Sequence, residues 1–154
     1  LPLSIQAKQA SYGKIRGVVD TVAVLADYED DLLVSLMWGK AAMGYRNGLR
    51  VRVFGERGAL EWQQSDPETL RHANEEGQIE IIDRGRTCLL EAAKPRYNRF
   101  KAGHPAGFVE AFANLYQDFA MEISGDHSGH STGYFSASVA SQGIAFLEEV
   151  TGST

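Results

Sequence analysis

The 154 residues are enough for one domain with a substantial core, and a composition of 44% hydrophobic and 23% charged residues is typical of a globular protein. The net charge of −5 argues against nucleic acid as the main partner, because phosphate binding needs clustered lysine and arginine. The single cysteine, Cys88, excludes a disulfide framework and favours the cytoplasm, and no apolar run reaches the roughly eighteen residues of a membrane-spanning helix.

The first hundred residues alternate in the manner of β-strands. Strands are expected at 4–9, 18–28 and 30–41, with the last two joined as an antiparallel hairpin by an acidic turn. A loop at 42–48 leads to LRVRVFGERGALEW (49–62), where valines alternate with arginines and the Gly55 to Gly58 turn reverses the chain. Segments 69–73 and 78–83 predict another hairpin. Six or seven mostly antiparallel strands are expected, with one polar and one apolar face.

Beyond residue 103 the apolar period changes from about 2 to about 3.6, which predicts helices. The first helix has a wide apolar stripe that should cover the sheet; Pro105 suits its first turn, and Ser124-Gly125 should end it. A second helix is expected in SASVASQGIAFLEEV (136–150), closed by Gly152. Strands followed by helices predict an α+β fold over residues 1–154, a single domain with an open, predominantly antiparallel sheet and C-terminal helices packed on one face. The free face should bind a partner, such as a second copy.

No segment contains a convincing catalytic set. Neither G-x-G-x-x-G nor G-x-x-x-x-G-K-[ST] occurs, so no cofactor-binding residue is expected in this chain. The segment DHSGH (126–130) offers a carboxylate and two imidazoles, but a polar loop is favoured over a metal site. Cys88 lies among apolar residues and is predicted to be a buried, inert thiol.

The charged and polar residues near the predicted helix could have structural or ligand-binding roles. The run KPRYNRFK (94–101) is interpreted as a solvated connector rather than a phosphate-binding track. Glu110 and Glu122 are expected on the solvent face, and Asp118 in a local pair. His104 lies at the turn before the helix, where backbone amides favour anions; a ring that packs or hydrogen-bonds to hold the turn is favoured over one that contacts a ligand.

Two segments, NGLRVRVFGERGALEW (47–62) and GHPAGFVEAFANLYQDFAMEI (103–123), together resemble the C-terminal domain of the Gfo/Idh/MocA oxidoreductases, the family of glucose–fructose oxidoreductase and inositol dehydrogenase. The resemblance extends over about residues 3–152. It implies a longer enzyme whose N-terminal Rossmann domain binds NAD or NADP. It further implies hydride transfer between the nicotinamide and a sugar or polyol-like substrate held between the domains, and a homo-oligomer formed through the open sheet face.

The sequence departs from that family by omission. The Rossmann fingerprint, the catalytic lysine of a Glu-Lys-Pro motif and the helix with an aspartate and a histidine are missing. Lys94 is not the family lysine, because Ala93 precedes it in place of glutamate. We therefore expect a C-terminal fragment, in line with a start at Leu1 without methionine, that alone is inactive and binds neither cofactor nor metal.

In the full-length enzyme the candidate substrate-binding residues are His104, Tyr45, Arg46 and Asn47, which would hydrogen-bond to sugar hydroxyls. The alternative is a stand-alone carbohydrate-binding or dimerisation module without catalytic activity. What precedes Leu1 in the coding sequence would distinguish the two.

Overall fold

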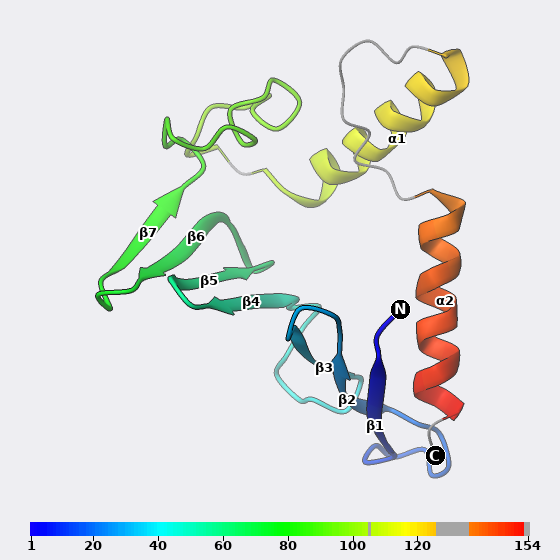
Figure 1. Cartoon of the computed structure of the whole chain (residues 1–154). Helices are drawn as coiled ribbons and strands as arrows, with labels where there is room; N and C mark the ends of the chain where they lie inside the picture. Colours follow the sequence, from blue (N-terminus) through cyan, green and yellow to red (C-terminus); the bar gives the residue numbers. More distant parts are fainter. Residues whose placement is uncertain (105, 126–135, 153–154) are drawn as a thin grey trace. The chain divides into compact units, whose positions relative to one another are not determined.

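The computed structural model describes residues 1–104, 106–125 and 136–152 (Figure 1). The chain divides into two compact units, one made of Leu1–Tyr45 and Phe135–Thr154 and the other of Arg46–Tyr134. We call them unit 1 and unit 2. Each contains one antiparallel sheet and one helix, so the predicted α+β class and antiparallel pairing are confirmed.

Unit 1 is a three-stranded sheet with one helix. The strands are β1 (Ser4–Ala10), β2 (Thr21–Asp27) and β3 (Leu33–Gly39), in the order β1-β2-β3, and the helix is α2 (Ala137–Gly152). The acidic turn between β2 and β3 places Asp30 and Asp31 at φ of 58° and 57°, a conformation that aspartate tolerates better than most residues. The hairpin expected from the sequence is therefore present.

The core of unit 1 follows from the alternation along β2. Val22, Val24 and Ala26 point to one side of the sheet and are buried, whereas the residues between them are less buried or exposed. Val150 of α2, only 1% exposed, packs against them. Gln9 Nε2 of β1 donates to the carbonyls of Val150 and Thr151, both at 3.3 Å, and so satisfies backbone groups that a helix end leaves unpaired. The predicted packing of a C-terminal helix on one sheet face is confirmed for α2.

Unit 2 is a four-stranded meander followed by a long connector and a helix. Its strands are β4 (Arg50–Gly55), β5 (Gly58–Gln63), β6 (Asp66–Asn74) and β7 (Ile79–Asp83), in the order β4-β5-β6-β7. Gly58, at φ 152°, begins β5; a Cβ there would lie 2.3 Å from the carbonyl oxygen of Ala73, so only glycine allows the strands this approach. Both hairpins expected from the sequence are present.

The helix of unit 2 is α1 (Phe108–Ser124), and Gly125 in the left-handed conformation ends it, as predicted. Its apolar stripe does not lie as expected: Phe108, Tyr116 and Ile123 are exposed, while Asp118 is buried. The physical reason is that arginines of the preceding connector bind the polar side of the helix. Pro105 lies outside the described residues.

Candidate functional site

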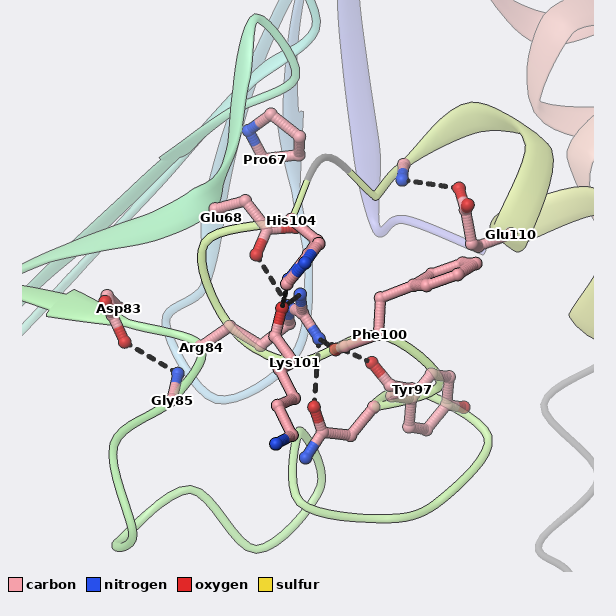
Figure 2. A network of polar contacts seen from close by, with 12 residues as sticks. Pro67, Glu68, Asp83, Arg84, Gly85, Tyr97, Phe100, Lys101, His104 and Glu110 are labelled. Carbon is pink, nitrogen blue, oxygen red and sulfur yellow. Dashed lines mark hydrogen bonds and ion pairs between the residues drawn. The ribbon is translucent and has the colours of Figure 1, made fainter.

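The connector between β7 and α1 is organised around Arg84 (Figure 2). Arg84 follows β7 directly, and its Nε donates to Glu68 Oε2 of β6 at 2.6 Å. The same guanidinium donates to acceptors of residues 97–101, at distances of 2.8 Å to the carbonyl of Phe100, 3.1 Å to Asn98 Oδ1, 3.4 Å to the carbonyl of Tyr97 and 3.5 Å to the carbonyl of Lys101. Arginine suits this role because its donors form a rigid fork.

His104 lies at the end of the segment that Arg84 holds. Its backbone N–H donates to the carbonyl of Lys101 at 3.1 Å, and its ring Nδ1 lies 3.2 Å from the same oxygen. Gly103, at φ 89°, provides the left-handed conformation that lets the chain fold back in this turn. The ring therefore holds the turn, as the favoured interpretation of the sequence has it, and its Nε2 makes no hydrogen bond with any described residue.

The other three candidate residues lie on the loop before β4. Tyr45 belongs to unit 1 and is 85% exposed, whereas Arg46 and Asn47 belong to unit 2 and are also exposed. Asn47 has φ 21°, in line with its predicted place in a tight turn. Within the described part of unit 2, no hydrogen bond joins His104 to Arg46 or Asn47. The joint role of the four residues stays a prediction.

The basic run 94–101 is largely exposed, as expected of a solvated connector, but Arg96 and Arg99 also bind α1. Arg96, with 7% of its side chain exposed, places Nη1 2.8 Å from Asp118 Oδ1 and donates from Nη2 to Asp118 Oδ2 at 2.9 Å. Arg99 donates to Asn114 Oδ1 at 2.5 Å and to Gln117 Oε1 at 2.8 Å. The interpretation as a solvated connector fails only for Arg96, whose side chain is buried against Asp118 of α1. The hydrogen bond to Asp118 raises the pKa of Arg96, so the guanidinium stays charged although it is buried.

Two further expectations, those for Asp118 and Cys88, are corrected by the structure, and Glu110 has an additional role. Asp118 pairs with a residue 22 positions earlier and not locally. The carboxylate of Glu110 accepts from the Gly107 N–H at 2.8 Å and so completes the start of α1; this bond, and one from its own N–H, lower the pKa of Glu110. Cys88 is exposed, because the turns around it form no apolar layer that could cover the thiol.

The described residues provide no metal site. No group of three or more histidine, cysteine, aspartate or glutamate side chains among them lies close enough together to hold an ion, and residues 126–130 lie outside the described part of the chain. No described helix has the length and apolar character needed to cross a membrane. The connector does provide hydrogen-bonding groups, among them the ring of His104, which contacts the same Lys101 carbonyl as Arg84.

Comparison with known proteins relates the chain to oxidoreductases, although no family profile matches it. It is 28% identical over 116 residues to the uncharacterised oxidoreductase YfiI of Bacillus subtilis, covering 75% of this chain and 29% of that protein. An oxidoreductase from Sinorhizobium meliloti is 31% identical with a TM-score of 0.83, covering 97% of this chain and 43% of its own. An inositol dehydrogenase homologue from Azotobacter vinelandii, solved with NAD⁺, is 26% identical with a TM-score of 0.87, covering 97% of this chain and 40% of its own.

These structural neighbours are Gfo/Idh/MocA-type oxidoreductases, so the resemblance expected from the two sequence segments is confirmed. The chain spans only about two fifths of the length of the solved structures it matches, at 43% and 40%, which agrees with a C-terminal domain. The fold is that of an oxidoreductase-type domain.

Proposed function

We propose that the chain is the C-terminal substrate-binding and oligomerisation domain of an NAD(P)-dependent oxidoreductase that transfers hydride to or from a sugar or polyol-like substrate. The strongest support is the fold match to the Azotobacter vinelandii inositol dehydrogenase homologue, which was also solved with NADH and myo-inositol, at 26% identity and a TM-score of 0.84. In this proposal residues 1–154 act as one domain of a cytoplasmic enzyme.

The cofactor, NAD or NADP, would be bound by a domain outside this chain. The residues present do not fit a dinucleotide, since no glycine-rich strand-to-helix turn occurs in the sequence. We therefore assign no residue of this chain to the cofactor and derive no step through it. The part left to this chain is to bind and orient the substrate.

Substrate binding is assigned to His104, Tyr45, Arg46 and Asn47. A polyol has many hydroxyls of similar polarity, so a site selects among them with a few well-placed donors and acceptors. The free Nε2 of His104 and the exposed side chains before β4 are groups of this kind. We expect His104→Ala in the full-length enzyme to raise KM by about tenfold, as for the loss of one hydrogen bond to substrate, and to affect KM more than Tm.

The matched control is His72→Ala, because His72 is also partly exposed but its ring pairs with Glu80 Oε1 at 3.0 Å on the sheet. This control should leave KM unchanged. An unchanged KM with a lowered Tm for His104→Ala would remove His104 from the substrate site.

Self-association is assigned to the open sheet. On one face of the unit 2 sheet the register aligns Phe54 with Ala59, Ala73 and Ile79; Phe54 is 75% exposed and Ile79 is 56% exposed. Large apolar side chains in such a row usually mark an interaction surface. Light scattering should give a dimer or larger species, and a monomer at high concentration would count against this assignment.

The decisive experiment for the whole proposal is to sequence the coding DNA upstream of the Leu1 codon. An open frame of roughly two hundred codons with a strand–G-x-G-x-x-G–helix and a later Glu-Lys-Pro would support the oxidoreductase. The full-length product should then reduce NAD⁺ or NADP⁺ with a member of a polyol panel that includes myo-inositol. A start codon immediately upstream would leave a stand-alone binding module.

A further inference from the structure

We propose that Arg84 is a positioning residue that fixes the tautomer of His104, so that Nε2 meets the substrate as a hydrogen-bond acceptor. This inference deepens the proposed function and rests on it for the role of His104 as a substrate contact. Its first step, the control of the histidine ring by Arg84, can be measured without any activity.

Arg84 can position the connector because its contacts with the sheet fix its own side chain. Its backbone N–H donates to the carbonyl of Glu68 at 3.1 Å, and its Nε donates to the Glu68 carboxylate at 2.6 Å. Glu68 lies within β6, and the Arg84 side chain is only 12% exposed. A charge-assisted bond to a strand residue gives the guanidinium a fixed direction, so its remaining donors impose positions on the connector.

Those donors fix the peptide that precedes the histidine turn. The Phe100 carbonyl accepts from Arg84 Nη1 at 2.8 Å and the Lys101 carbonyl from Nη2 at 3.5 Å, as Figure 2 shows. Both bonds orient successive peptide groups, so the Lys101 oxygen is held facing His104. That oxygen accepts hydrogen bonds from both the backbone N–H and the ring Nδ1 of His104.

The tautomer of His104 follows from the kind of partner that its ring has. A carbonyl oxygen can only accept, so the Nδ1 atom 3.2 Å from it must carry the proton. In the neutral ring Nε2 then has a lone pair and no proton. The hydrogen bond made by one ring nitrogen thus sets the chemistry of the other.

An unprotonated Nε2 distinguishes between substrate oxygens. A hydroxyl can donate to it, whereas a carbonyl oxygen or a deoxygenated carbon cannot. Sites that hydrogen-bond a substrate hydroxyl reject analogues that lack it, because a polar group is then left unpaired. By fixing this tautomer, Arg84 should make the site prefer a polyol that has a hydroxyl at the position facing His104 to the analogue that lacks this hydroxyl.

The test uses long-range ¹H–¹⁵N spectra of the imidazoles in ¹⁵N-labelled protein at about pH 8, where an ordinary histidine is neutral. The His104 signals are assigned by their loss in His104→Gln. In the unmodified protein Nδ1 should have the shift of a protonated nitrogen and Nε2 that of a bare one. Arg84→Lys keeps the charge but lacks the fork, so the two shifts should move toward a common averaged value.

The matched control is Arg86→Lys. Arg86 lies two residues further along and pairs with Glu80 at 2.6 Å, without a hydrogen bond to residues 97–101 in the described structure. It should leave the His104 pattern unchanged. A His104 pattern in Arg84→Lys identical to that of the unmodified protein would overturn the proposal.

If circular dichroism shows that Arg84→Lys does not fold, Glu68→Gln replaces it, since this variant weakens the anchor of Arg84 and keeps the arginine. Unchanged His104 shifts in Glu68→Gln would equally overturn the proposal.

In an active full-length enzyme, Arg84→Lys should raise KM for the polyol by about tenfold, and combining it with His104→Ala should raise KM little beyond the effect of His104→Ala alone. Absence of NAD(P)-dependent activity would refute the proposed function while the spectra still decide the role of Arg84.

Discussion

The ion pair between Arg96 and Asp118 gives the sharpest prediction about stability. Of the ion pairs in the described residues it is the most buried, with 7% and 5% of the two side chains exposed. Two contacts, of 2.8 and 2.9 Å, join the guanidinium to the carboxylate, and Arg96 Nε has no hydrogen-bond partner in the described structure. The other recorded partners of the guanidinium are neutral: the Asn114 carbonyl accepts from Nη2 at 3.3 Å, and the Tyr97 ring centroid lies 5.1 Å from Cζ, so neither would replace the charge of the carboxylate.

Asp118→Asn should therefore lower the free energy of unfolding by about 3–5 kcal/mol, the cost of leaving one charge of a buried pair uncompensated. That is a large part of the roughly 5–15 kcal/mol that stabilises an ordinary domain. Replacing both partners, as Arg96→Met with Asp118→Leu, should cost much less, because no buried charge remains. The difference between the single and the double variant is what identifies burial as the cause.

Urea unfolding followed by tryptophan fluorescence can measure this locally. Trp62 lies in unit 2 with the ion pair and Trp38 lies in unit 1, so a Trp38→Phe background reports on unit 2 alone. The slope of free energy against urea should stay the same, so that the midpoint reports stability. A loss below about 1 kcal/mol, the range of exposed pairs, would refute the burial of this pair.

Three further predictions concern other parts of the chain. The pKa of Glu110 is lowered below its ordinary value of 4.5 by the Gly107 N–H, so its charge stabilises the fold above that value and the gain is lost as the pH falls through the lowered pKa. The Tm difference between the unmodified protein and Glu110→Gln should thus be present at about pH 7 and shrink as the pH falls below the ordinary value of 4.5; a constant difference would contradict the cap. Val150→Ala should cost about 2 kcal/mol in unit 1, because the side chain is 1% exposed and leaves a cavity against β2, whereas exposed Ile144→Ala should cost little. Cys88 should react with a thiol reagent in the folded protein as fast as in urea, and protection would show that it is covered.

The strands and turns could be predicted from the sequence because their signals are local. Alternation along residues 49–62 and the glycines at 55 and 58 fix a hairpin within a few residues, and Gly125 marks the end of α1 within one turn. The same holds for His104, whose place before the helix was evident from the chain alone. These features need no knowledge of distant contacts.

The side-chain roles could not be predicted because their partners are distant or carry no sequence signal. Arg96 contacts Asp118, which lies 22 residues later in the chain, and this contact determines which side of α1 is buried. Arg84 could not be singled out, since most of its acceptors are backbone carbonyls, which every residue supplies. In the sequence, Arg84 cannot be distinguished from other charged residues at the ends of strands.

The contact between Gln9 and Val150 has a consequence for biosynthesis. These residues are 141 positions apart, and the buried side of β2 is covered by α2, which is made after all of unit 2. At about 5–20 residues per second, the ribosome needs roughly seven to thirty seconds to pass from one to the other. During that time Val22, Val24 and Ala26 are exposed on the nascent chain, while the segment of unit 2 is already complete. Chaperones should therefore engage β1, β2 and β3 until α2 has emerged.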